Sequence, residues 1–135
     1  MRKSAPQRRF GSVNERIEHC PSWVQQSFAS LDAACRNAAP DVSVRDAARA
    51  EGRVYYCGAR HVKFCRIDPN TKRIGVWFRH DIIGEVRLSG KWRHNRPDGP
   101  WVYVDEDDPL EPVIALVKQS SEAALSRQEV RAPAK

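Results

Sequence analysis

Residues 73–79 alternate with a period of two between apolar side chains and polar or small ones. Ile74, Val76 and Phe78 would point one way from an extended backbone, and the residues between them the other way. Those intervening residues are Arg73, Gly75, Trp77 and Arg79. The pattern predicts a strand with one face in a core and the other carrying cations and an aromatic ring. Such a strand needs partner strands and a layer that covers its apolar face.

Two further strands are predicted before it. Residues 53–57 and 61–67 are rich in β-branched and aromatic side chains, and Gly58 ends the first run. Residues 68–71, Asp-Pro-Asn-Thr, predict a type I turn with Pro at its second position. We therefore expect three antiparallel strands, whose second face displays Arg53, Tyr55, His61, Lys63, Arg73, Trp77 and Arg79.

This second face has two interpretations. Sheets that bind single-stranded RNA use exposed aromatic rings to stack on bases and flanking cations to contact phosphates. The alternative is purely structural, with Tyr55 and Trp77 forming a cross-strand pair that stabilises the sheet by about 0.2–1 kcal/mol. The sequence leaves both interpretations open.

Helices are expected on both sides of these strands. Ser12 and Glu15 have the spacing of a capping box, which predicts a short helix to about residue 19. Ser22 and Gln25 repeat that spacing at the start of a helix over 22–39. This second helix has an apolar stripe of Val24, Phe28, Leu31 and Cys35. A last helix is expected over 109–127, with Asp108 as its N-cap residue and Pro109 in its first turn.

The remaining segments complete the predicted fold. Residues 40–52 permit a short edge strand or one helical turn, the two-residue period of 81–88 favours a strand, and 101–104 has strand composition. The fold class is α+β: an antiparallel β-sheet of four to five strands with N-terminal and C-terminal helices packed on one face. The domain boundaries are a disordered basic arm over 1–11, a single α+β domain over 12–127 and a flexible tail over 128–135.

The order of these features resembles a family of small bacterial domains of unknown function. A capped helix, a helix closing on Pro-Asp-Val, a Tyr-Tyr strand, a Val-Lys-Phe strand, an Ile-Gly-Val-Trp-Phe strand, a Gly-containing loop and a final helix follow one another. This layout is similar to the MmcQ-like and YdhG-like domains over residues 12–127. The resemblance implies a double-wing shape like that of DNA-binding domains, and it carries over no catalytic residue.

Positive charge is concentrated in the predicted sheet and in the loop after it. Residues 45–96 hold thirteen basic and five acidic residues, a balance of +8, whereas residues 97–135 hold four and eight, a balance of −4. The predicted loop over 89–100 places Lys91, Arg93 and Arg96 around Trp92. This arrangement suits a nucleic acid, either DNA or RNA, although Trp92 could instead cover the sheet edge.

No pattern of residues predicts catalysis, a metal site or a cofactor. Cys57, His61 and Cys65 alternate with core residues along strands, whereas structural zinc sites usually place their cysteines two to four residues apart. The acidic residues 105–108 are explained by the positive end of the following helix dipole. The four cysteines suggest free thiols in a reducing cytoplasm. No apolar run has the length of a membrane span, and the N-terminus has no apolar signal segment.

These observations favour a non-enzymatic binding module. The predicted nucleic-acid-binding residues are Arg53, Tyr55, Lys63, Arg73, Trp77, Arg79, Lys91, Trp92, Arg93 and Arg96. Two alternatives use the same face. One is an acidic protein partner, because Trp, Tyr and Arg also concentrate binding energy in protein interfaces. The other is a small anionic ligand.

Overall fold

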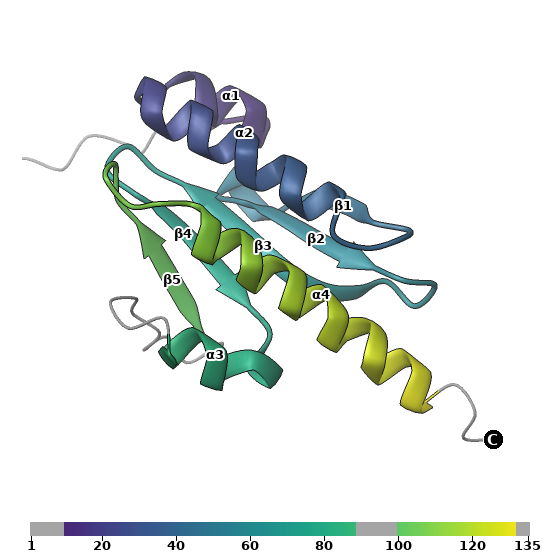
Figure 1. Cartoon of the computed structure of the whole chain (residues 1–135). Helices are drawn as coiled ribbons and strands as arrows, with labels where there is room; N and C mark the ends of the chain where they lie inside the picture. The colour runs from purple at the N-terminus through teal and green to yellow at the C-terminus, as the bar shows by residue number, and fades with distance from the viewer. Residues whose placement is uncertain (1–9, 89–99, 132–135) are drawn as a thin grey trace, which may run out of the picture.

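The computed structural model describes residues 10–88 and 100–131 of the chain, which adopt an α+β fold (Figure 1). Five strands form one antiparallel sheet in the order β1-β2-β3-β4-β5, so that each strand pairs with its neighbours in sequence. The predicted fold class is therefore confirmed. None of the described helices is long and apolar enough to cross a membrane.

The elements follow one another with short connections. The strands are β1 (Ser43–Asp46), β2 (Arg53–Cys57), β3 (Val62–Pro69), β4 (Ile74–Phe78) and β5 (Trp101–Val104). The α-helices are α1 (Val13–Glu18), α2 (Ser22–Arg36), α3 (Ile83–Leu88) and α4 (Glu111–Arg131). Two 3₁₀ turns are η1 (Ala48–Ala50) and η2 (His80–Ile82).

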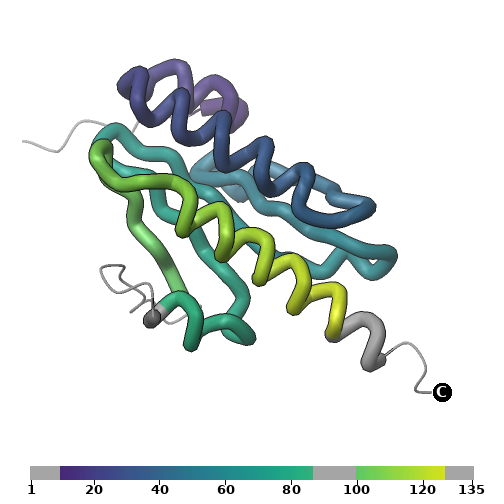
Figure 2. Tube along the Cα trace, in the orientation of Figure 1, coloured from purple at the N-terminus to yellow at the C-terminus, as the bar shows by residue number. Residues whose placement is uncertain are grey.

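The molecule has two layers, a sheet and a helical layer on one of its faces. α2 and α4 lie side by side on one face of the sheet and contact each other, and α1 packs beside α2 (Figure 1, Figure 2). We call the sheet face under these helices the inner face. Its core includes Ile67, Ile74, Val76, Phe78 and Val102 from the strands and Phe28, Leu31, Val113 and Val117 from the helices. The alternation predicted for residues 73–79 is therefore confirmed on its apolar side.

The starts of the helices agree with the predicted caps only at α1. There the Ser12 hydroxyl accepts a hydrogen bond from the Glu15 N–H at 3.1 Å, while the Glu15 carboxylate accepts one from the Gly11 N–H at 2.7 Å. The predicted capping box at α2 is wrong, because Pro21 occupies the N-cap position and its carbonyl accepts hydrogen bonds from the first turn. The cap predicted at Asp108 is also wrong, since its carboxylate accepts from the Asp105 N–H at 2.9 Å and closes the preceding turn.

The prediction of a strand over residues 81–88 is wrong. This segment forms η2 and α3. Ile82 and Val86 are both buried and lie four residues apart, which places them on the same side of a helix. Over so few residues, alternation and helical spacing predict some of the same apolar positions, and the burial of Ile82 and Val86 decides between them.

Other boundaries differ from the predictions in smaller ways. Both alternatives for residues 40–52 are present, because β1 is followed by η1. β3 continues through Pro69, so the turn comes later, where the Asn70 N–H donates to the Arg73 carbonyl at 3.0 Å. α2 ends before its predicted boundary, at Arg36, and α4 continues beyond residue 127 to Arg131.

Candidate functional site

The face of the sheet opposite the helices carries a distinct set of side chains, and we call it the outer face. Residues opposite each other in antiparallel strands point to the same side of a sheet. The register opposes Val54 to Arg66, Arg66 to Trp77, and Trp77 to Trp101, which gives one continuous row across four strands. A second row joins Asp68, Gly75 and Tyr103. The outer face also includes Arg45, which opposes Val54, and the opposed pair Tyr56 and Lys63.

Apart from Tyr56 on β2, the aromatic residues placed on the outer face lie on β4 and β5. The rings of Trp101 and Tyr103 are stacked, with an interplanar angle of 12° and centroids 6.3 Å apart. Both rings lie close to Gly75. A Cβ atom at that position would be 3.3 Å from each of them. Trp101 is only 2% exposed, whereas Trp77 and Tyr103 are half-buried. Trp77 and Tyr103 therefore offer more accessible ring surface than Trp101 does.

A cation lies over each of these three rings. Lys63 Nζ is 4.3 Å from the centroid of the Trp77 ring, and Arg73 Cζ is 5.4 Å from that of Tyr103. Arg66 Cζ lies 6.0 Å from the Trp101 centroid. All three distances fall within the range in which the ring quadrupole attracts a positive charge. Three cation–aromatic pairs thus lie next to one another over β3, β4 and β5.

The charge of Arg66 is also paired with carboxylates. Its guanidinium donates to Asp68 at 2.7 and 3.1 Å and lies 3.8 Å from Glu51. These contacts fix the guanidinium beside the Trp101 ring and offset much of its charge. Arg66 therefore holds the rings in place more than it adds to the positive potential of the face.

The expectation that Arg53 and Tyr55 lie on the outer face is wrong. Both point to the inner face, where Arg53 is 8% exposed and Tyr55 is fully buried. The alternation of β2 places Val54 and Tyr56 outside instead. Successive residues of a strand point to opposite faces, but Tyr55 and Tyr56 are identical in polarity. The sequence therefore does not indicate which of the two rings faces the core. Tyr55 and Trp77 lie on opposite faces, which excludes the cross-strand pair proposed for them.

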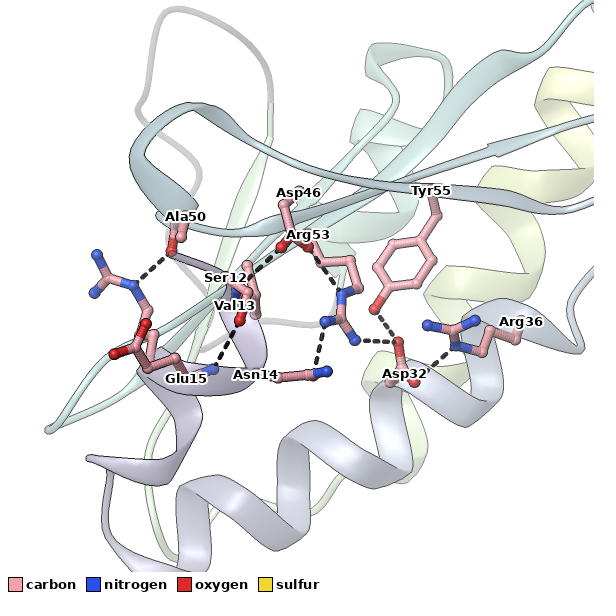
Figure 3. A network of polar contacts seen from close by, with 11 residues as sticks. Ser12, Val13, Asn14, Glu15, Asp32, Arg36, Asp46, Ala50, Arg53 and Tyr55 are labelled. Atoms are coloured by element: carbon pink, nitrogen blue, oxygen red, sulfur yellow. Dashed lines mark hydrogen bonds and ion pairs between the residues drawn. The ribbon is translucent and has the colours of Figure 1, made fainter. Parts of the chain in front are cut away.

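The buried polar atoms of Arg53 and Tyr55 are satisfied by a network with the helices (Figure 3). The Arg53 guanidinium donates to Asn14 Oδ1 at 2.9 Å and to oxygens of Asp32 and Asp46, each at 3.4 Å. The Tyr55 hydroxyl donates to Asp32 Oδ1 at 2.5 Å. The guanidinium also lies over the Phe28 ring, 5.4 Å from its centroid. This network joins β2 to α1, α2 and β1, and is structural.

Ionisation of the network follows from these contacts. Burial by itself raises the pKa of Asp32, but the hydrogen bonds from Tyr55 and Arg36 and the charges of Arg36 and Arg53 outweigh it and lower that pKa. Burial is the main cause that raises the pKa of the Tyr55 hydroxyl, and Cys35 and Asp32 raise it further. Asp32 is therefore held as the anion and Tyr55 as the neutral donor.

The other predicted residues are distributed at the edges of the outer face. Arg79 Nη1 donates to the Lys63 carbonyl at 3.1 Å and its guanidinium pairs with Asp81 at 3.0 Å, so it ties the end of β4 to β3. His61 is exposed in the connection before β3, with Nδ1 3.3 Å from Ser43 Oγ. The loop candidates lie outside the described residues: Lys91, Trp92, Arg93 and Arg96.

The thiols and acidic groups form no reactive constellation in the part of the chain that the structure describes. Cys20, Cys35, Cys57 and Cys65 are all buried. Burial raises the pKa of Cys57, although Arg79 partly offsets it, and so reduces the thiolate fraction at neutral pH. No described group of three or more His, Cys, Asp or Glu side chains is placed to hold a metal ion.

Sequence reasoning missed Trp101, Tyr103 and Arg66 as members of the outer face. A signal was present, because Trp-Val-Tyr-Val at 101–104 alternates aromatic and aliphatic residues. Once Val102 opposes Val76 in the core, the two rings must share the face of Trp77. The sequence did not indicate that β4 pairs with β5, because α3 lies between the two strands in the chain.

No model of a known protein family matches the chain, and no curated protein or solved structure matches it significantly. The resemblance to the MmcQ-like and YdhG-like domains therefore stays a prediction.

Proposed function

We propose that the outer face binds nucleic acid. The observation that carries this proposal is a set of three adjacent cation–aromatic pairs, formed by β3, β4, β5 and the turn before β4. The pairs are Lys63 with Trp77, Arg66 with Trp101 and Arg73 with Tyr103. The described helices α2 and α4 pack on the inner face and leave this set on the opposite side of the sheet. On such a surface the cations can contact the anionic phosphates of a nucleic acid, and the rings can stack on its flat bases.

The charge distribution supports the same proposal. Lys63 and Arg73 belong to the segment 45–96, whose balance of basic over acidic residues is +8. Arg45 on β1 and Lys72 in the β3–β4 turn are exposed and extend the positive region along the sheet. Cations on a fixed surface attract a polyanion by releasing its condensed counterions, which makes the affinity strongly dependent on salt.

The test is the salt dependence of binding by the full chain and by two double variants. A fluorescein-labelled 12-nucleotide single strand is titrated at several salt concentrations. Lys63→Gln/Arg73→Gln removes two charges from the outer face, and Arg36→Gln/Lys118→Gln removes the same charge from exposed positions in the helical layer. If both outer residues contact phosphates, the first variant flattens the log–log slope by roughly 1.4, at about 0.7 per phosphate.

The matched helical variant is expected to keep the wild-type slope. Equal losses in the two variants would mean that only net charge matters, and would contradict a defined binding face. An acidic protein partner is the competing outcome. It is favoured if the chain retains a lysate protein after nuclease treatment through Lys63 and Arg73 but does not bind the oligonucleotide.

A further inference from the structure

We infer that the outer face selects single-stranded over double-stranded nucleic acid, with Trp77 and Tyr103 as two base-stacking positions. This inference rests on the proposed function and makes it more specific. It names the state of the ligand and the two rings that recognise it.

Of the three rings on β4 and β5, those of Trp77 and Tyr103 are the accessible ones. Trp101 lies opposite Trp77 in the register and stacks on Tyr103, but at 2% exposure it has almost no surface left for a ligand. Trp77 and Tyr103 are half-buried. Trp101 therefore supports the two rings from between them, while they present their remaining surface outward.

The spacing of Trp77 and Tyr103 suits two separate bases. Because Trp101 is the residue opposite Trp77, Tyr103 is its diagonal neighbour, and such neighbours lie about 7–8 Å apart on one face of a sheet. This is too far for one base to cover both rings face to face. It is a suitable separation for successive bases of an extended strand that have been pulled apart from each other, as happens on other aromatic sheet surfaces.

A duplex cannot use these rings in the same way. Its bases are stacked on one another and present only their edges in the grooves. Rings that are half-buried in a sheet do not protrude far enough to enter that stack. A duplex would therefore contact only the cations, whereas a single strand gains both phosphate and stacking contacts.

The cations that lie over the two rings would have to move before a base could stack there. Lys63 lies over Trp77 and Arg73 over Tyr103, so an incoming base has to take the place of a side chain that now occupies the ring face. Both side chains are long and can move aside while their charge stays at the edge of the base. In that position they can meet the phosphate of the same nucleotide. The ring and its cation would thus serve one nucleotide together.

The experiment compares four probes with the full chain: a 12-nucleotide single strand of DNA, the same sequence in RNA, the matching 12-base-pair duplex, and inorganic polyphosphate, which has no bases. The variants are Trp77→Ala and Tyr103→Ala. Trp23→Ala is the matched control, because Trp23 is half-buried on α2 in the helical layer. Trp77→Phe retains a ring at the same place and guards against a simple loss of packing.

The inference predicts that either single strand binds more tightly than the duplex. Trp77→Ala and Tyr103→Ala should each weaken single-strand binding roughly 5- to 150-fold, the equivalent of about 1–3 kcal/mol. Binding of polyphosphate, which has no bases, and the salt slope should stay unchanged. Trp77→Phe should recover most of the loss, and Trp23→Ala should bind like the wild type.

Two outcomes would overturn the inference, and they can be told apart. If the wild type binds single strand, duplex and polyphosphate alike and the ring variants change nothing, stacking is wrong while nucleic-acid binding through charge stands. If the wild type binds none of the four probes, the proposed function fails together with the inference.

Discussion

The ammonium nitrogen of Lys63 lies 4.3 Å from the centroid of the Trp77 ring. Lys63 is on β3 and Trp77 on β4, so their contact depends on the register that opposes Trp77 to Arg66. In the pairing of β2 with β3, Tyr55 opposes Cys65 but the next residue, Tyr56, opposes Lys63, so β3 has a bulge of one residue between Cys65 and Lys63. This bulge turns the Lys63 side chain to the outer face, where its charge lies over the Trp77 ring.

This contact should be measurable as a coupling between the two side chains. In a double-mutant cycle with Lys63→Met and Trp77→Leu, the unfolding free energies should show an interaction of about 0.5–1 kcal/mol. Urea unfolding of the wild type, both single variants and the double variant gives this value. A control cycle that pairs Trp77→Leu with Lys118→Met should show none, since Lys118 lies on α4 and donates to the Ala38 carbonyl. A Lys63–Trp77 coupling as small as that control would contradict the contact.

The hydroxyl of Tyr55 should contribute strongly to stability. Tyr55→Phe keeps the buried ring and removes the hydrogen bond to the Asp32 carboxylate, so we expect a loss of about 1.5–3 kcal/mol at neutral pH. The measurement is the urea midpoint at constant m-value. Tyr56→Phe is the matched control, because the Tyr56 hydroxyl makes no hydrogen bond within the described residues and its removal should cost less than about 0.5 kcal/mol. Equal effects of the two changes would refute the structural role assigned to Tyr55.

Asp32 should make the stability of the protein dependent on acid pH. The folded structure lowers the pKa of the Asp32 carboxyl below its ordinary value of 3.8, so the ionised carboxylate stabilises the fold. This contribution is complete well above pH 3.8 and is lost as the pH falls through the folded-state pKa. The difference in unfolding free energy between the wild type and Asp32→Asn should therefore be constant above about pH 5 and shrink below about pH 4. Unfolding both proteins across this range tests it. A difference that stays the same down to pH 3 would show that the Asp32 pKa is not lowered.

Gly52 should not tolerate a side chain. A Cβ atom there would meet the Asp68 carboxylate and lie 2.8 Å from the Ile67 carbonyl oxygen, and Asp68 is held in place by Arg66. Gly52→Ala should cost at least about 1–3 kcal/mol. Gly84→Ala is the control, because nothing lies within 4 Å of a Cβ on that exposed residue of α3, and it should be neutral or stabilise by up to about 1 kcal/mol. Thermal unfolding of both variants would show it, and similar melting temperatures would contradict the close approach at Gly52.

The sequence was sufficient to predict the elements that have a clear period. Ile74, Val76 and Phe78 alternate with polar or small residues, and the inner face of β4 is as predicted. The stripe of Val24, Phe28, Leu31 and Cys35 likewise placed α2 correctly against the core. In both cases burial and periodicity agree, so local pattern and tertiary packing favour the same structure.

The failures occurred where two solutions have similar local patterns. Residues 81–88 satisfy a two-residue period and a helical one, and the burial of Ile82 and Val86 selects the helix. Arg53 and Tyr55 are polar at one end, so their burial depends on hydrogen-bond partners in other elements. Asn14 and Asp32 lie 39 and 21 residues from Arg53, and Asp46 lies on the neighbouring strand β1. Partners of this kind cannot be predicted from the strand alone.

The central claim is that the outer face, and not the helical layer, binds nucleic acid. The most direct measurement is a nuclear magnetic resonance titration of the ¹⁵N-labelled chain with a 12-nucleotide single strand. We predict that the indole N–H signal of Trp77 on β4 and the amide signals of its neighbours on β3 shift, while the indole signal of Trp23 on α2 stays in place. Shifts of Trp23 and of α2 and α4 with an unmoved Trp77, or no shifts at all, would contradict the claim.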